Sequence, residues 1–161
     1  MRLTHLVSTA LGAIMLVTGT SSAVSAQLLD AKVISLDAAR TMLSAADAEA
    51  RKNGWTVSIA IVDAAGTLIA FQRMDNASLT SADVSIGKAR TAARMRRPTK
   101  ALDSLITTGR VHYLAFDGIM PLEGGLPLAY QGKIIGGIAA SGATSAQDAQ
   151  IAAAGMAALV P

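Results

Sequence analysis

The sequence predicts an α+β protein in which helices pack on an antiparallel sheet. Two pairs of alternating apolar segments, each joined by a short turn, predict two β-hairpins, and hairpins build antiparallel sheets. Segments with apolar residues three and four positions apart precede, separate and follow these hairpins, which predicts helices. The chain has 161 residues, the length of one domain. A sheet this small needs helices on one or both faces to bury it.

Residues 1–26 have the composition of a secretory signal peptide rather than of a folded element. Arg2 supplies a positive charge, an apolar stretch follows over residues 6–17, and Val24 and Ala26 suit cleavage after Ala26. The apolar stretch is shorter than the roughly 20 residues that cross a bilayer, which disfavours the alternative of an uncleaved anchor. We therefore expect an exported protein, periplasmic or extracellular, with no stable membrane anchor.

The remaining chain, residues 27–161, is expected to form one domain that begins with a helix and a hairpin. Ser35 is the expected N-cap of the helix, which a basic turn and a glycine end at residues 52–54. Alternating apolar and polar residues then predict strands over residues 55–63 and 67–74. The turn between them contains a glycine, as a tight hairpin turn requires.

Two helices are expected after this hairpin. Residues 81–96 place alanines and one isoleucine on a single face, which suits close packing against a sheet, and Pro98 ends the helix. Residues 99–108 predict a shorter helix. Residues 111–125 are the least regular segment of the chain.

A second hairpin and a last helix complete the expected fold. Residues 126–130 and 134–141 predict its two strands, with a glycine in the turn between them. Residues 145–160 predict the helix, in which Ser145 and Asp148 are expected to form a capping box. The order of elements is therefore helix, hairpin, two helices, hairpin, helix.

Composition excludes several classes of site. The chain has no cysteine, which rules out disulfides, thiolate zinc sites, a cysteine nucleophile and covalent haem attachment. Without residues 1–26 it carries thirteen basic and eleven acidic residues, a net charge of +2. This mild charge does not favour a nucleic-acid partner. The residues alone specify no reaction, so whether the protein is an enzyme stays undecided.

His112 is the sole histidine of residues 27–161. One histidine cannot form a two-histidine metal site, but it can be an axial ligand of a haem iron. Tyr113 beside it is a second candidate ligand. The alternative is a surface or structurally hydrogen-bonded histidine.

A basic run without acidic residues is the more unusual signal. It comprises Lys88, Arg90, Arg94, Arg96, Arg97 and Lys100. On a helix, spacings of four and three place Arg90, Arg94 and Arg97 on one face. Such a stripe suits carboxylates, propionates or phosphates. The alternatives are a solvated face, or pairing with acidic residues across a subunit interface.

The other chemistry-bearing residues carry weaker signals. Asp63 and Asp75 flank a hairpin, where carboxylates commonly cap turns. Gly124, Gly125 and Pro127 predict a tight loop whose backbone closely approaches a ligand or another strand. Further candidates for weak axial ligands, although core packing is their usual role, are the methionines at positions 42, 74, 95 and 120.

Several short segments also match a known pattern. They are VDAAG at residues 62–66, RMD at 73–75, GKARTA at 87–92, GGLPL at 124–128 and IIGGIAASGATSAQDAQIAAAG at 134–155. In this order they closely resemble the GlcG/HbpS family of small haem-binding proteins, which is related to the C-terminal domain of PduO. The resemblance covers residues 33–160.

The resemblance implies a profilin-like fold with a five-stranded antiparallel sheet and helices packed on its faces, assembled into a homo-oligomer. The residue pattern supplies four strands, so we expect a fifth within residues 28–34 or 111–116. The family also implies haem or a related tetrapyrrole as cofactor, and it carries a haem-degrading label. Exported relatives are linked to haem or redox sensing with a partner sensor kinase, and other members occur beside glycolate or diol metabolism.

Residues of this chain that match the family segments fall in three places. They are Lys88, Arg90, Thr91 and Ala92 in the basic segment, Gly124, Gly125 and Pro127 in the glycine–proline loop, and Asp148 and Gly155 in the last helix. The resemblance assigns no iron ligand. Glu123 and Asn76 stand where the family often has glycine, which leaves the ligand preference open.

The favoured function is therefore an exported haem-binding protein. Its propionates would lie on basic groups such as Arg90 or Arg94, and His112 or Tyr113 would bind the iron. The aromatic content of 3% favours a shallow or inter-subunit site over a deep stacked one. One alternative is an enzyme on a small anionic metabolite, with an arginine clamp and an aspartate base at position 63 or 148. Another is a non-catalytic oligomer that partners a sensor protein.

Overall fold

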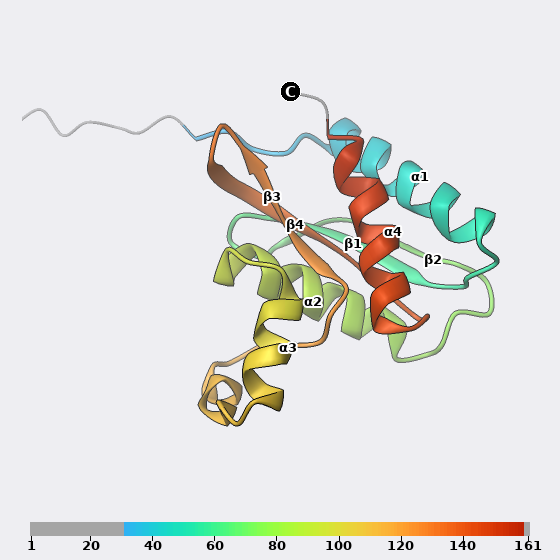
Figure 1. Ribbon diagram of the computed structural model, residues 1–161. Helices are drawn as coiled ribbons and strands as arrows, with labels where there is room; N and C mark the ends of the chain where they lie inside the picture. The colour runs from blue at the N-terminus through green and yellow to red at the C-terminus, as the bar shows by residue number, and fades with distance from the viewer. Residues whose placement is uncertain (1–30, 160–161) are drawn as a thin grey trace, which may run out of the picture. The chain divides into compact units, whose positions relative to one another are not determined.

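A four-stranded antiparallel sheet separates two layers of helices in the computed structural model, which describes residues 31–159 (Figure 1). The strands lie in the order β2-β1-β4-β3. They are β1 (Ser58–Asp63), β2 (Leu68–Arg73), β3 (Gly125–Tyr130) and β4 (Lys133–Ser141). The helices are α1 (Leu36–Lys52), α2 (Ser81–Met95), α3 (Thr99–Thr107) and α4 (Ser145–Ala157), with a 3-10 helix η1 (Val111–Ala115). The expected signal peptide, residues 1–26, lies outside the described residues.

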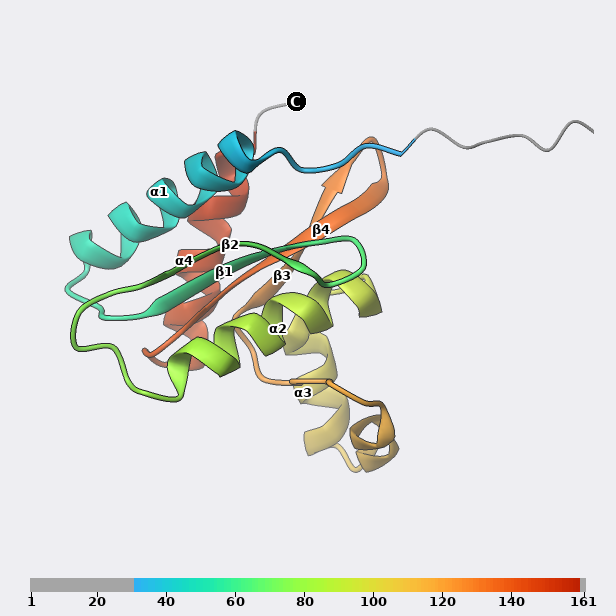
Figure 2. The ribbon, with the colours of Figure 1, turned by 180° about the vertical axis from the view of Figure 1, so that it is seen from behind.

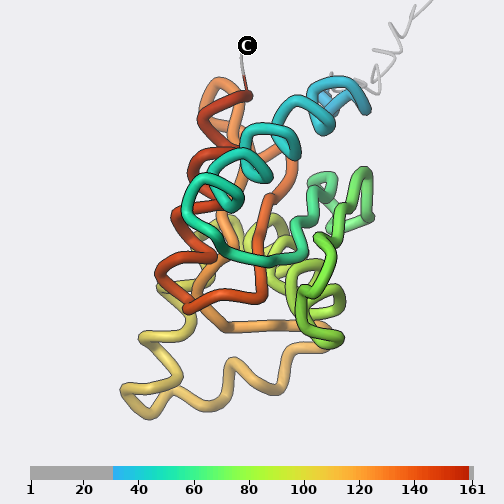
Figure 3. The backbone as a smooth tube through the Cα atoms, turned by 90° about the vertical axis from the view of Figure 1, so that its right-hand side faces the viewer, coloured from blue at the N-terminus to red at the C-terminus, as the bar shows by residue number. Residues whose placement is uncertain are grey.

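Helices α1 and α4 cover one face of the sheet, and α2 covers the other (Figures 1 and 2). The central strands β1 and β4 are therefore buried on both faces. Helix α3 and η1 pack against each other and extend away from the sheet beyond the end of α2 (Figure 3). The α+β class and both expected hairpins are confirmed.

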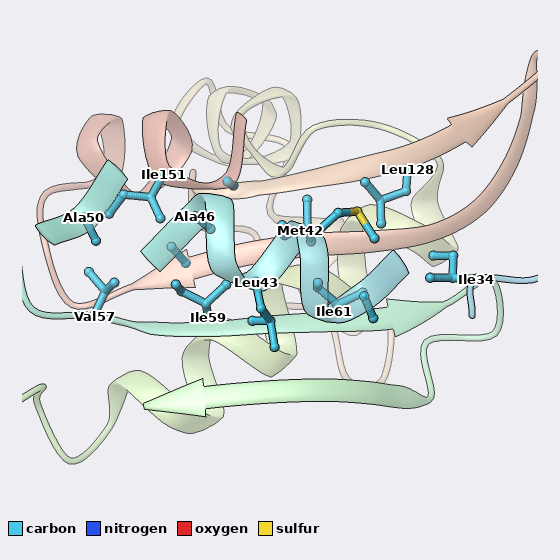
Figure 4. Packing of buried hydrophobic residues seen from close by; sticks show 14 of the residues in the cluster. Ile34, Met42, Leu43, Ala46, Ala50, Val57, Ile59, Ile61, Leu128 and Ile151 are labelled. Carbon is cyan, nitrogen blue, oxygen red and sulfur yellow. The ribbon is translucent and has the colours of Figure 1, made fainter. Parts of the chain in front are cut away.

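The main core lies between α1, α4 and the sheet. Ser35 caps α1, where its side-chain oxygen accepts a hydrogen bond from the Ala38 amide at 3.1 Å. The apolar face of α1 then places Met42 and Leu43 over β1 and β4 (Figure 4). Ile138 of β4 is also fully buried in this cluster. Burial of each such side chain contributes roughly 1.5–3 kcal/mol.

Small residues bring α2 close to the opposite face of the sheet. Ala89 and Ala93 of α2 pack with alanines and a valine of β1 and β4. A Cβ added at Gly137 of β4 would lie 2.3 Å from the Ala89 carbonyl oxygen, so no larger residue fits there. This close approach fixes which side chains of α2 face the protein interior and which face solvent.

The β1–β2 turn has the capping predicted from its aspartate. One side-chain oxygen of Asp63 accepts hydrogen bonds from the Ala65 amide at 2.9 Å and the Thr67 amide at 2.8 Å. Gly66 has φ +90°, a conformation that favours glycine. Asp63 therefore has a structural role, as the turn-capping interpretation predicts.

The expected fifth strand is absent from residues 31–159. Residues 31–35 form no strand, and residues 28–30 lie outside the described part. Residues 111–115 form η1 instead, held by short-range bonds such as Phe116 amide to Tyr113 carbonyl at 3.3 Å. This segment packs on α3, away from the sheet, and pairs with neither edge strand, β2 nor β3.

Two helix ends also differ from expectation. Thr144, not Ser145, is the N-cap of α4, and its amide donates to Gln147 Oε1 at 3.0 Å. With Thr144 as the N-cap, the residue that completes the capping box is Gln147, and Asp148 is instead buried against Lys88. Helix α2 ends at Met95, and the next residue, Arg96, adopts a left-handed conformation with φ +54°.

Among residues 31–159, no helix has both the length and the apolar character needed to cross a membrane. The longest helix, α1, has 17 residues and places charged side chains along its exposed face. The domain described by the structure thus contains no helical membrane span.

Candidate functional site

Helix α2 divides the predicted site residues into an inner and an outer group. Lys88 lies on its inner side and is buried, whereas Arg90 is half-buried and Arg94 exposed on its outer side. Positions two apart on a helix differ by about 200° in direction. The contiguous basic segment of the sequence therefore does not form one binding surface.

The inner group is built around a buried ion pair. Lys88 Nζ lies 2.8 Å from Asp148 Oδ2 of α4, and both side chains are 3% exposed. The ammonium also donates to the Ala140 carbonyl at 3.2 Å, while Asp148 accepts from the Ala143 amide at 3.1 Å. Burial raises the pKa of Asp148, and the hydrogen bond and charge of Lys88 oppose that rise. The pair joins the helices on opposite faces of the sheet.

The glycine loop closes over this pair. Gly124 has φ +126°, and a Cβ there would lie 2.8 Å from both Lys88 Nζ and the Asp148 Cβ. A Cβ at Gly125 would lie 2.6 Å from the Lys88 carbonyl oxygen. Thr99 Oγ1 accepts from the Gly125 amide at 2.9 Å. The close approach predicted for this loop is therefore to the protein's own buried groups, and haem binding by Lys88, Gly124 and Gly125 stays a prediction.

Pro127 lies in β3 opposite Gly137 of β4 and is half-buried. Strand β3 is at the edge of the sheet, where a residue without an amide hydrogen is tolerated. Its position accounts for the proline structurally, and its contact with a ligand stays a prediction.

The outer group lines two adjoining hollows between α2 and residues 116–120. The first, the Arg94 hollow, has a volume of about 260 Å³ and is lined by Thr91, Arg94, Met95, Phe116 and Asp117. The second, the Arg90 hollow, has a volume of about 380 Å³ and is lined by Asp83, Ile86, Gly87, Arg90 and Met120. Gly118 and Ile119 border both. Thr91 Oγ1 accepts from the Met120 amide at 2.8 Å, which holds the segment against α2.

The arginines of these hollows lack acidic partners. No carboxylate in residues 31–159 forms an ion pair within 4.0 Å of Arg90 or Arg94. Arg90 Nε donates to the Gly66 carbonyl at 3.1 Å. Arg97 does not share this face, because it follows the end of α2, and its Nε donates to the Met95 carbonyl at 3.3 Å. The expected stripe of three arginines is therefore a pair.

An aromatic run leads to the Arg94 hollow from η1. The rings of His112 and Tyr113 are stacked with centroids 4.8 Å apart, and those of Tyr113 and Phe116 are 6.3 Å apart. Phe116 lines the hollow beside Arg94. The structure thus brings the two candidate iron ligands and one predicted arginine to the same part of the molecule.

The methionines considered as axial ligands and the aspartates considered as bases lie in different parts of the structure. Met42 and Met74 are buried in the main core, whereas Met95 and Met120 line the outer hollows. Neither Asp63 nor Asp148 lines these hollows, so the aspartates suggested as bases do not meet the arginines there.

Sequence reasoning missed three residues that shape the outer surface. Phe116 completes the aromatic run, and its spacing of three from Tyr113 is the signal that indicates it. Thr91 anchors the 116–120 segment. Gly66 leaves room for the aliphatic parts of Arg90 and Arg94, because a Cβ there would lie 2.6 Å from Arg90 Cγ and 3.1 Å from Arg94 Cδ. No sequence pattern connects Gly66 with α2.

Comparisons with known proteins agree with this architecture. Protein GlcG of Escherichia coli strain K12 is 42% identical over 109 residues, which are 68% of this chain and 81% of that protein. The crystal structure of HbpS has 32% identity and a TM-score of 0.79, over 84% of this chain and 96% of that one. A crystal structure of a PduOC:heme complex has 30% identity and a TM-score of 0.73, over 79% and 95% of the two chains.

A family model covers most of the described domain. The family is described as "Haem degrading protein HbpS-like", and its model matches residues 34–157. The match spans the sheet, all four helices and the segment that carries both outer hollows. The chain therefore belongs to the HbpS-like family.

Proposed function

We propose that the protein binds haem on its outer surface, at the Arg94 hollow and the adjoining η1. The observation that carries this proposal is the run of His112, Tyr113 and Phe116, which ends beside Arg94, an arginine with no acidic partner among residues 31–159. Family membership and the relative solved as a haem complex support it.

The chemistry of these residues suits haem. Stacked and apolar side chains can cover the flat macrocycle, and the surface around η1 is rich in exposed apolar groups, which are Val111, Leu114, Phe116 and Leu122. The Arg94 guanidinium suits a propionate, which it can bind with two parallel hydrogen bonds. His112 and Tyr113 belong to residue types that hold haem iron, and bound haem would supply that iron centre.

The dimensions indicate a shallow site. The Arg94 hollow, at about 260 Å³, is at or below the lower end of the roughly 300–1,000 Å³ of ligand pockets. A bound haem would therefore extend from the hollow across η1. Its outer face would meet solvent or a second copy of this chain.

A haem titration of residues 27–161, followed by Soret absorption, tests the proposal. We expect saturable binding of one haem per subunit. His112→Ala or Tyr113→Phe should shift the Soret band, whereas the control Tyr130→Phe, on β3 away from η1, should leave it unchanged. Linear uptake without saturation would show adventitious haem and overturn the proposal. Saturable binding that neither η1 variant alters would place the iron elsewhere.

We further propose that the protein is exported and acts in haem handling or sensing. The features of residues 1–26 support export, and these residues lie outside the described structure. The mass of the protein recovered outside the cytoplasm after expression of the full chain tests this. Export predicts a chain that begins at Gln27, and retention of the full-length chain in the cytoplasm would contradict it. A sensor-protein partner and a homo-oligomer stay predictions.

A further inference from the structure

We propose that the Arg90 hollow is a separate binding site for a small carboxylic acid that also carries an ammonium or hydroxyl group. The hollow has a volume of about 380 Å³ and lies beside, not within, the aromatic surface assigned to haem. Arg90 and Asp83, both on α2, line it. This proposal does not rest on haem binding.

Arg90 is oriented for a carboxylate before any ligand arrives. Its Nε is occupied by the Gly66 carbonyl at 3.1 Å, which leaves the two terminal nitrogens as a pair of donors. Gly66 lies in a turn that Asp63 holds with two hydrogen bonds, so this acceptor is fixed. Two parallel donors match the two oxygens of a carboxylate.

The surroundings of Arg90 strengthen the attraction between its guanidinium and an anion. Arg90 is half-buried, and no carboxylate of residues 31–159 lies within ion-pairing distance of it. Ile86, Ile119 and Met120 supply apolar, partly buried walls, which lower the local dielectric and favour a ligand with a carbon skeleton. Gly87 adds no side chain to the hollow. These features favour a small organic acid over an inorganic anion.

Asp83 sets the second requirement on the ligand. It lies seven residues before Arg90 on α2, a rise of about 10 Å along the helix. Its exposed carboxylate has no cationic partner within 4.0 Å among the described residues. A ligand whose ammonium or hydroxyl group is separated from its carboxylate by several carbons could span this distance and donate to Asp83, whereas a second carboxylate at that end would be repelled. The hollow is therefore suited to amino or hydroxy acids.

Three acids of equal carbon number test this assignment. Hexanoate has no donor beside its carboxylate, 6-hydroxyhexanoate adds a terminal hydroxyl, and 6-aminohexanoate adds a terminal ammonium. Each is titrated by calorimetry into haem-free protein comprising residues 27–161. We expect saturable binding of the hydroxy and amino acids, each at least about tenfold tighter than hexanoate, because hydrogen bonds to a charged group are among the stronger ones. The proposal is overturned if none of the three acids binds saturably, or if all three bind with equal affinity.

Variants assign the two roles separately. Arg90→Gln should weaken binding of 6-hydroxyhexanoate and 6-aminohexanoate by about tenfold or more, and Asp83→Asn should remove most of their advantage over hexanoate. Lys133→Gln removes one positive charge, as Arg90→Gln does, at the exposed first residue of β4, and should alter neither the affinity nor the preference. If Arg90→Gln binds these acids with the same affinity as the unaltered protein, the proposal that Arg90 holds the carboxylate is overturned. If Arg90→Gln fails to fold, Asp83→Asn decides, since this exposed side chain has no structural partner in residues 31–159 and an unchanged preference would overturn the proposal.

Discussion

Lys88 and Arg90 lie two residues apart on α2, yet they face opposite environments. Lys88 is buried and pairs with Asp148, whereas Arg90 lines a surface hollow and contacts only a backbone carbonyl through Nε. Every buried polar side chain of residues 31–159 has a hydrogen-bond partner, those on the inner side of α2 included. On the outer side, Arg90 and Arg94 form no ion pair with any acid among the same residues. The same basic segment thus supplies an internal structural contact and an external surface suited to anions.

The largest effect is expected from breaking the inner pair. Lys88→Met leaves the Asp148 carboxylate buried without its partner and should lower the free energy of unfolding by about 3–5 kcal/mol. The double variant Lys88→Met with Asp148→Leu removes both charges and should recover most of this loss. Urea unfolding measures both. A double variant no more stable than the single one would show that the pair is not the cause.

The pH dependence of this variant sharpens the same contrast. With Lys88 absent, burial raises the pKa of Asp148 further, because only the backbone hydrogen bonds from Ala143 and Gly142 still oppose the rise. A carboxyl whose folded-state pKa exceeds its unfolded value destabilises the fold above the folded pKa, and this cost disappears as the pH falls below the unfolded value. The loss in free energy of unfolding caused by Lys88→Met should therefore become smaller as the pH falls from 7 to about 4. A loss that is constant across this range would show that the ionised Asp148 carboxylate is not its cause.

An intermediate effect is expected from the glycine loop. Gly124→Ala places a methyl group 2.8 Å from Lys88 Nζ at a residue with φ +126°, and should lower the free energy of unfolding by about 1–3 kcal/mol. Gly132→Ala is the matched control, because it also has positive φ but meets no atom within 4 Å. Thermal unfolding compares them. Equal losses would mean that backbone conformation alone, and not the buried pair, requires Gly124.

The smallest effect on stability is expected on the outer side. Arg94→Gln should change the free energy of unfolding by less than about 0.5 kcal/mol, as for other exposed residues. It should nevertheless weaken haem binding by about tenfold through loss of a charge-assisted hydrogen bond. Arg97→Gln, which follows the end of α2, should leave haem affinity unchanged. Equal losses in both variants would indicate a general effect of charge.

Most of the fold could be predicted from the sequence because its signals are local. Alternating residues indicated both hairpins, and the spacing of Ala39, Leu43 and Ala46 indicated α1. Of the two alternatives for a fifth strand, the one within residues 111–116 was wrong because this segment packs on α3 instead of beside an edge strand, and no local pattern records such a tertiary contact. The capping error at α4 has a similar origin, since Asp148 is directed to Lys88, 60 residues earlier in the chain.

The candidate site was less predictable because it depends on tertiary contacts. The basic segment indicated a stripe of three arginines, of which only Arg90 and Arg94 share a face. Sequence spacing could not show that Lys88 and the glycine loop would meet each other. Gly66 lies 24 residues before Arg90 and contacts it only in the folded chain. The positions of His112 and Tyr113 near Arg94 likewise depend on the path of residues 116–120, which one hydrogen bond from the Met120 amide to Thr91 anchors.

The buried pair also has a consequence for the dynamics of the protein. Lys88 and Asp148 connect α2 to α4 through the interior. If either helix separates from the sheet, the charged side chain on the other helix loses its partner. We therefore expect both helices to open as one cooperative unit in native-state hydrogen exchange. A ligand that holds the outer side of α2 would then slow amide exchange in α4, on the opposite face of the sheet.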